Sequence, residues 1–108
     1  MTAKGFVESA GFKVVCMPEP ERNISGAYIG DLLSWVMGNA NSGDAWITIM
    51  SNVNILAVAT LTDCACIILS EGVAVDEAIC NTAKEKGINI VVSPASSYEV
   101  AVELSRAL

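Results

Sequence analysis

The four cysteines carry the most reactive chemistry in this sequence. Cys16, Cys64, Cys66 and Cys80 could hold zinc or an iron–sulfur cluster as thiolates, but such sites usually take their ligands from paired C-x-x-C turns. The spacings here are 48, 2 and 14 residues. Cys64 and Cys66 would lie on the same side of a strand, so a redox or metal-binding accessory protein is an alternative interpretation. No basic residue close in sequence lowers their pKa, and we expect buried, free thiols without a metal.

The remaining chemistry-bearing residues do not match a known catalytic motif. The sequence has no histidine, so a Ser-His-Asp triad cannot form, and no serine lies in a G-x-S-x-G turn. The glycines fit neither the dinucleotide-binding pattern nor the phosphate loop that a kinase would need. Asp31, Asp63 and Glu71 are too dispersed to specify Mg²⁺. We therefore expect a protein that is not an enzyme and that has no cofactor.

Composition restricts the possible partners and the compartment. The 108 residues are 53% apolar and carry a net charge of −6, which excludes disorder and argues against binding to nucleic acid. The length suits a single domain over residues 1–108. The N-terminus lacks the apolar run of a signal peptide, and later apolar stretches are too short to span a bilayer. These features predict a cytoplasmic protein that does not interact with membranes.

Stretches with helical and strand periodicity alternate along the chain. Apolar runs such as Cys64–Leu69, and Ile88–Val92 with Asn89 as its one polar residue, are typical of strands covered on both faces in a parallel sheet. The order α-β-β-α-β-α-β-α-β-α predicts a three-layer α/β/α fold with a mostly parallel sheet of about five strands. The expected elements are helix 3–10, strand 13–17, strand 24–29, helix 30–37, strand 45–50, helix 51–61, strand 64–69, helix 75–86, strand 88–92 and helix 96–108.

Several helix boundaries have recognisable signals. Asp31 is expected to cap the amino terminus of its helix, and Gly38 to end it. Ser96 and Glu99 have the spacing of a capping box. Helix 51–61 is apolar on nearly every side, so it should be buried on more than one face.

The fold places a candidate binding site at one rim. In open parallel sheets, ligands bind beyond the carboxyl ends of the strands. Asn52 and Ser93 offer hydrogen bonds there, and glycines allow close backbone approach. Helix amino termini at Asn52 and Ser96 can hold an anion with free amides, although both residues also fit simple caps. The predicted ligand-binding residues are Gly30, Asp31, Ser51, Asn52, Ser70, Glu71, Gly72 and Ser93.

One long segment has very few charges. Residues 24–62 contain only Asp31 and Asp44, whereas charged residues are frequent in the segments before and after. Aromatic residues and methionine are enriched at protein interfaces as well as in cores. We expect Trp35, Met37 and Trp46 to contribute to a homodimer or partner surface.

Four segments resemble the DRTGG domain family. They are Tyr28–Ser34, Gly43–Thr48, the helix Asn54–Ala59 and the strand Ala65–Gly72, and the resemblance extends from about Gly11 to Leu108. The sequence is thus similar to the N-terminal domain of HPr kinase/phosphorylase, to the insert of CBS-containing family II pyrophosphatases, and to a middle segment of long phosphotransacetylases.

The resemblance implies a non-catalytic regulatory or accessory module, often located at a dimer interface. Stand-alone forms resemble small proteins encoded beside iron-only hydrogenase and redox genes, so a hydrogenase-related, redox or metabolic enzyme is the implied protein partner. The Asp-Arg of the family name aligns with Ser51-Asn52, and its Thr-Gly-Gly with Ser70-Glu71-Gly72. The arginine is thus absent, and Asn52 cannot replace its permanent charge in anion recognition.

Overall fold

The protein folds into five helices and five strands, in the predicted order. The computed structural model describes residues 1–108. None of the helices is long and apolar enough to cross a membrane. The elements are α1 (Ala3–Ala10), β1 (Lys13–Cys16), β2 (Gly26–Ile29), α2 (Leu33–Asn39), β3 (Asp44–Thr48), α3 (Asn54–Thr62), β4 (Cys66–Leu69), α4 (Glu77–Lys86), β5 (Ile90–Val92) and α5 (Ser97–Ala107).

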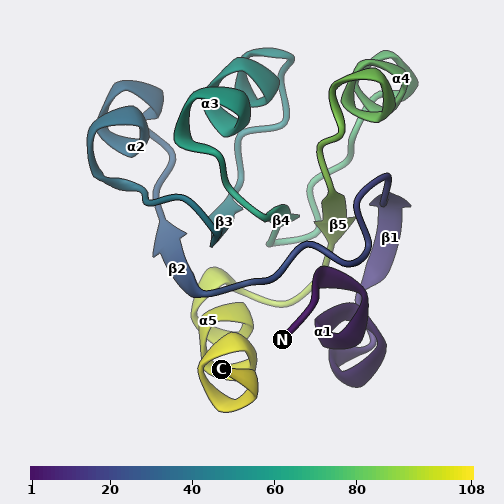
Figure 1. Cartoon of the computed structure of the whole chain (residues 1–108), viewed down its shortest axis with the longest axis vertical. Helices are drawn as coiled ribbons and strands as arrows, with labels where there is room; N and C mark the ends of the chain where they lie inside the picture. The colour runs from purple at the N-terminus through teal and green to yellow at the C-terminus, as the bar shows by residue number, and fades with distance from the viewer.

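The strands form one mixed, mostly parallel sheet with the order β1-β5-β4-β3-β2. Strands β2, β3, β4 and β5 are parallel to one another, and only β1 is antiparallel to its neighbour β5. Helices α2, α3 and α4 cover one face, while α1 and α5 cover the other (Figure 1). The predicted three-layer α/β/α fold is confirmed.

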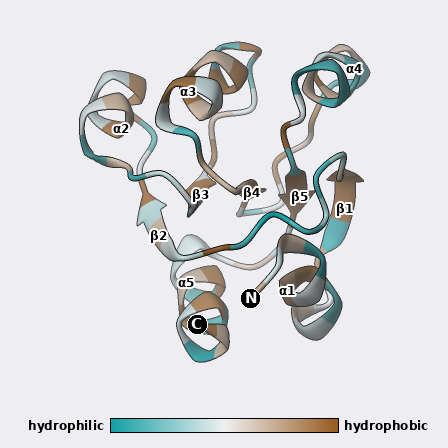
Figure 2. Ribbon diagram, in the orientation of Figure 1, coloured by the Kyte–Doolittle hydropathy of each residue, from teal (hydrophilic) through white to brown (hydrophobic).

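The sheet separates two apolar clusters. Every residue of β3 and β4 is buried, because successive side chains point to opposite faces and each face is covered by helices. Trp46 and Ile67 pack with the α2, α3 and α4 side, whereas Ile47 and Ile68 pack with the α1 and α5 side. Figure 2 shows the resulting concentration of hydrophobic residues along the central strands.

Trp46 belongs to the core and not to a surface. Its side chain is fully buried, and its indole Nε1 donates a hydrogen bond of 2.9 Å to the carbonyl oxygen of Gly30. The prediction that Trp46 contributes to an interface was therefore wrong. The sequence-based estimate failed because the two tryptophans lie in the same charge-poor segment, and only the packing distinguishes buried Trp46 from exposed Trp35.

Helix boundaries agree only partly with the sequence signals. The capping box of Ser96 and Glu99 is confirmed. Asp31 does not cap α2, whose N-cap is Leu32 without a side-chain hydrogen bond. The Asp31 carboxylate instead accepts hydrogen bonds from Thr48 and Ile49 at the end of β3. Gly38 lies inside the last turn and does not end the helix, which continues to Asn39.

The packing confirms one further expectation and corrects another. Helix α3 is buried on more than one side, because it packs in the cluster under the sheet and contacts both α2 and α4, although Leu61 on it is 74% exposed. Cys64 and Cys66 do not lie on one side of a strand. Since β4 begins only at Cys66, Cys64 stays in the preceding turn and packs with the α2–α4 cluster, whereas Cys66 joins the α1–α5 cluster.

The two tryptophans provide a matched test of this packing. Replacing Trp46 by phenylalanine should lower the free energy of unfolding by about 1–3 kcal/mol, because the Gly30 carbonyl loses its donor and the core loses volume. The control, Trp35→Phe, should change it by less than about 0.5 kcal/mol, since Trp35 is 63% exposed. Urea unfolding measures both, and equal losses in the two variants would contradict the assignment.

Candidate functional site

At the ends of β2 and β3, the predicted rim is held together by one carboxylate. The Oδ1 atom of Asp31 accepts hydrogen bonds from the Thr48 hydroxyl at 2.8 Å and from the Ile49 amide at 2.9 Å. Asp31 thus fixes the ends of two neighbouring parallel strands against each other. Asn52 has a local role, because its Oδ1 accepts the amide of Asn54, the first residue of α3.

At the ends of β4 and β5, a second group of predicted residues comes together. The amide of Gly72 donates to the carbonyl oxygen of Ser93 at 3.0 Å, and the Ala95 amide donates to the Ser93 hydroxyl at 3.1 Å. The hydroxyls of Ser70 and Ser97 are 2.7 Å apart. Ser97 was not among the residues predicted from the sequence, although its position directly after the capping serine indicated the first turn of a helix.

Glu71 fills the space in front of α5. Its Oε2 atom accepts the Ser97 amide at 3.1 Å, while the Ser96 amide donates to the Glu99 carboxylate at 3.3 Å. Two amides at the start of α5 are therefore already bound to carboxylates of the chain itself. Glu71 adopts a left-handed backbone with φ of 62°, followed by Gly72 at 72°. A side chain at such a position is strained, so the carboxylate contact is maintained at a conformational cost.

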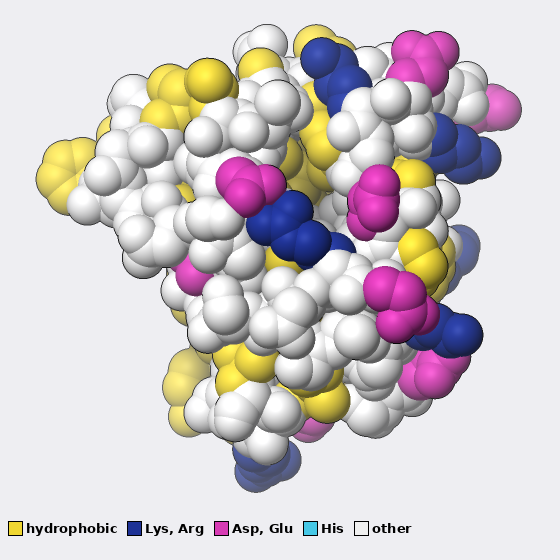
Figure 3. Space-filling view, in the orientation of Figure 1, with side chains coloured by type: hydrophobic (Ala, Val, Ile, Leu, Met, Phe, Trp, Pro, Cys, Tyr) yellow, Lys and Arg dark blue, Asp and Glu magenta, His cyan; other side chains and the backbone are white.

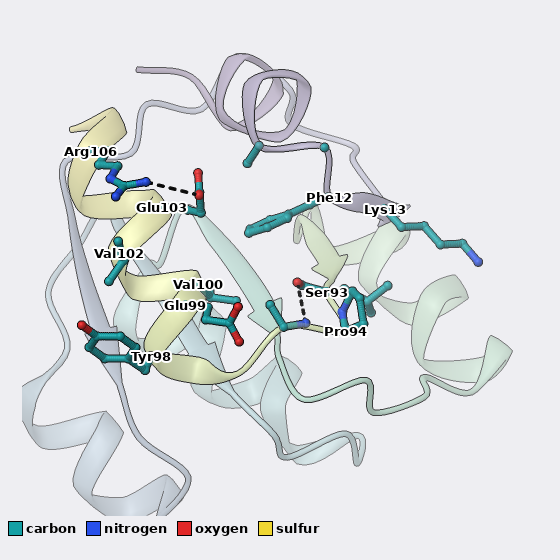
Figure 4. A pocket seen from close by; sticks show the side chains of 14 residues that line it. Phe12, Lys13, Ser93, Pro94, Tyr98, Glu99, Val100, Val102, Glu103 and Arg106 are labelled. Carbon is teal, nitrogen blue, oxygen red and sulfur yellow. Dashed lines mark hydrogen bonds and ion pairs between the residues drawn. The ribbon is translucent and has the colours of Figure 1, made fainter.

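A groove opens beside this second group, between α5 and the segment that joins α1 to β1. Its volume is about 750 Å³, within the range of small-molecule sites. In Figure 4, Phe12 projects towards α5, with Glu103 and Arg106 at one end and Ser93 and Pro94 at the other. The lining residues are Ala10, Gly11, Phe12, Lys13, Val92, Ser93, Pro94, Ala95, Tyr98, Glu99, Val100, Val102, Glu103 and Arg106.

The groove combines an apolar wall with charges of both signs. The ring of Phe12 packs edge-on against Phe6, with centroids 5.2 Å apart. Arg106 approaches Glu103 to 3.8 Å, whereas Lys13 forms no ion pair and extends outward at the side away from α5 (Figure 4).

Ser93 is the one predicted site residue that lines this groove. The others lie elsewhere along the rim. The groove could not be expected from sequence spacing, because α1 and α5 are at opposite ends of the chain. The antiparallel pairing of β1 with β5 brings the two segments together.

A second cavity lies at the opposite ends of the strands, between Arg22, Asp63, Cys64, Lys86 and neighbouring backbone. Its volume is about 390 Å³. Arg22 binds the Asp63 carboxylate at 3.0 Å and the Asp63 carbonyl oxygen at 2.8 Å. The hydrogen bond from Arg22, helped by one from Ser42, holds the pKa of Asp63 below its usual range. This ion pair connects the β1–β2 segment to the end of α3. Arg22 and Asp63 therefore have a structural role, which is to hold these two segments together.

Three of the four thiols are in environments that disfavour the reactive thiolate. Burial raises the pKa of Cys64 to about 12, and it also raises the pKa of Cys66 and of Cys16. All four cysteines are free. No three or more histidine, cysteine or acidic side chains gather where they could hold a metal ion. The structure therefore gives no support to the alternative of a cysteine-based redox or metal protein.

Comparison with known proteins supports the fold and its family. The DRTGG domain family matches residues 14–107. A solved structure is similar over 99% of this chain, with a TM-score of 0.73 and 15% sequence identity. It contains the CBS and DRTGG domains of the regulatory region of Clostridium perfringens pyrophosphatase, complexed with the activator diadenosine tetraphosphate. The present chain spans 47% of that structure's length. No curated protein matches the sequence.

Replacing Glu71 separates backbone strain from helix capping. Glu71→Ala removes the carboxylate from the start of α5 and keeps a side chain at positive φ, so the free energy of unfolding should fall by about 0.3–1 kcal/mol. Glu71→Gly also removes the carboxylate but relieves the left-handed strain, and it should be about 1 kcal/mol more stable than Glu71→Ala. Urea unfolding compares the variants. Equal stability of the glycine and alanine variants would contradict the positive φ at this position.

The raised thiol pKa values predict slow labelling of the native protein. A shift from 9.0 to about 12 leaves roughly 1,000-fold less thiolate at Cys64 at pH 8, so its reaction with a chromogenic disulfide reagent should be strongly retarded. Protein unfolded in urea is the control, in which all four thiols should titrate rapidly. Rapid labelling of Cys64 and Cys66 in the native protein, shown by mass spectrometry of peptides, would contradict their burial.

Proposed function

The chain belongs to the DRTGG domain family, and from this membership we propose that it is a non-catalytic regulatory module that homodimerises and binds a small anionic metabolite, preferably a nucleotide, beside the ends of its strands. The observation that carries the ligand half of the proposal is the groove of about 750 Å³ next to Ser93. We retain the sequence-based expectation of a cytoplasmic protein.

The chemistry of the groove favours a ligand with a ring over a simple phosphate. Phe12 and Val102, which are both partly exposed, offer apolar contact area to a base or another flat group. The cations that line the groove are Lys13 and Arg106. The carboxylates of Glu99 and Glu103 offset their charge, so charge alone would not retain inorganic phosphate. Lys13 has no carboxylate partner, and its flexible stem allows the ammonium group to turn towards an anionic group bound in the groove.

The rest of the predicted rim supports this choice of location. Asp31 is engaged by Thr48 and Ile49, and Glu71 is engaged by Ser97. These contacts leave fewer free donors at the strand ends than the sequence suggested. An anionic ligand approaching Glu71 would also meet a like charge, which is unfavourable. We therefore place the proposed ligand in the groove and not at these occupied strand ends.

A regulatory role agrees with the similar structure, in which a DRTGG domain occurs within a regulatory region whose crystal contained an activating nucleotide. We propose by analogy that ligand binding here changes how the module contacts a partner, which is a second copy or a metabolic or redox enzyme. Exposed Trp35 and Met37 provide apolar surface for such a contact.

A ligand screen tests this proposal. Adenosine nucleotides, adenosine, inorganic phosphate and an acyl phosphate are added separately while the melting temperature is followed. A ligand at 100 times its Kd stabilises the folded state by roughly 2.7 kcal/mol, so a nucleotide should raise the melting temperature clearly and phosphate should not. If no compound changes it, the small-ligand half of the proposal is wrong.

Two lysine variants locate the binding. Lys13→Gln should weaken the binding of a nucleotide by up to about tenfold, because an anionic group of the ligand loses its cation. A tenfold change in Kd corresponds to roughly 1.4 kcal/mol. Lys4→Gln is the matched control, since Lys4 is exposed on α1 and does not line the groove. Titration calorimetry gives both affinities. An equal loss in the two variants would indicate a general charge effect and not binding in the groove.

A further inference from the structure

The two edges of the sheet have different chemistry. Edge strand β1 begins with Lys13, has a register irregularity between Val14 and Cys16, and is soon followed by Pro18 and Pro20. A charged residue, a bulge and proline are devices that prevent an edge from pairing with another chain. Edge strand β2 has none of them. Its four residues are in regular register with β3 and include no charge and no proline.

The open side of β2 presents backbone groups for pairing. The Gly30 amide donates to the Ile47 carbonyl oxygen, and Tyr28 lies two residues before it. Since pairing alternates along a strand, the backbone groups of Tyr28 point towards β3, and those of Ala27 and Ile29 point away. Both of these residues are exposed, and Ile29 has 51% of its surface accessible. Two N–H groups and two carbonyl groups are thus directed outward along the edge.

The surroundings of β2 are unusually free of charge for a chain with a net charge of −6. Asp31 follows β2 and is bound to Thr48 and Ile49, while Asp44 on the neighbouring strand β3 is buried and accepts the Asn41 amide. In Figure 3, the surface over α2 shows no charged side chain, whereas charged side chains gather over α4 and near the middle of the view. Two copies that each carry a net charge of −6 repel each other, and this repulsion is weakest where the charge-poor surfaces around β2 meet.

From these observations we infer that the β2 edges of two copies pair in antiparallel orientation, so that two five-stranded sheets become one continuous sheet. This inference rests on the homodimer of the proposed function and specifies its interface. A two-fold axis at Tyr28 sets Ala27 of each copy opposite Ile29 of the other, and each such pair exchanges two backbone hydrogen bonds. The four free donors and four free acceptors of the two edges are then all used.

The same register explains why a second copy suits this edge. Asp31 is three residues from the two-fold axis, so the two Asp31 residues lie on opposite sides of it, about 20 Å apart at roughly 3.3 Å per residue. This separation exceeds the Debye length of about 8 Å at physiological ionic strength, so their repulsion is screened. The exposed apolar side chains of Leu32 and Trp35 follow the edge directly and add area of the type enriched at interfaces.

Molecular mass in solution tests the inference through matched variants. The wild-type chain of 11.3 kDa should sediment as a dimer of twice that mass. Ala27→Pro removes an N–H that the alternation along β2 directs outward, and Ile29→Lys places a charge on the edge, so both should yield monomers. Leu61→Lys is the control, because Leu61 is more exposed than Ile29 but lies on α3, and it should remain dimeric. Circular dichroism checks that each variant is folded.

Amide hydrogen exchange in the unmodified protein provides a second, independent measurement. The Ala27 and Ile29 amides should exchange slowly at high protein concentration and faster on dilution, whereas the Gly30 amide, bonded within the chain, should not depend on dilution. A dimer that survives Ala27→Pro and Ile29→Lys with rapid exchange at both amides would overturn the β2 pairing alone. A wild-type monomer at about 100 µM would overturn both the pairing and the proposed homodimer, while the ligand screen would still stand.

Discussion

The burial of β3 and β4 on both faces is the constraint on which the rest of the structure depends. None of their residues reaches solvent, so each face of the central sheet must be covered by helices. Three helices on one face and two on the other satisfy this requirement, and the parallel connections follow from it. The low proportion of charged residues has its main cause here, because a small three-layer domain devotes much of its sequence to two apolar clusters.

At the rim of this sheet, carboxylates serve as internal ligands. Asp31, which follows β2, accepts hydrogen bonds from a hydroxyl and an amide at the end of β3, and Glu71 accepts one from an amide at the start of α5. An acidic chain thus occupies with its own side chains several donors that an anionic ligand would need. Binding is therefore expected where apolar surface remains accessible, in the groove between Phe12 and α5.

The two surfaces proposed for function lie towards opposite edges of the sheet. The groove adjoins β1 and β5, where the start of β1 carries Lys13, and the inferred pairing surface is β2 at the other edge. A module of this kind can bind a small molecule and a second copy at the same time, because neither surface contains residues of the other. The rigid, fully buried strands between them keep the two surfaces in a fixed relation.

The order of elements, the three-layer architecture and the capping box of Ser96 and Glu99 could be read from the sequence, because apolar periodicity and capping depend on neighbouring residues. The positions of Trp46, Asp31 and Cys64 could not. Trp46 is buried because helices cover both faces of β3, and its indole N–H donates to the Gly30 carbonyl oxygen. Asp31 binds β3 instead of capping its own helix. The groove was beyond sequence reasoning for the same reason. Its walls are about 80 residues apart in the chain, and they meet only because β1 turns back antiparallel to β5. Apolar periodicity and capping between neighbouring residues determined the helices and strands. Contacts between residues distant in the chain decided which side chains remain accessible for binding.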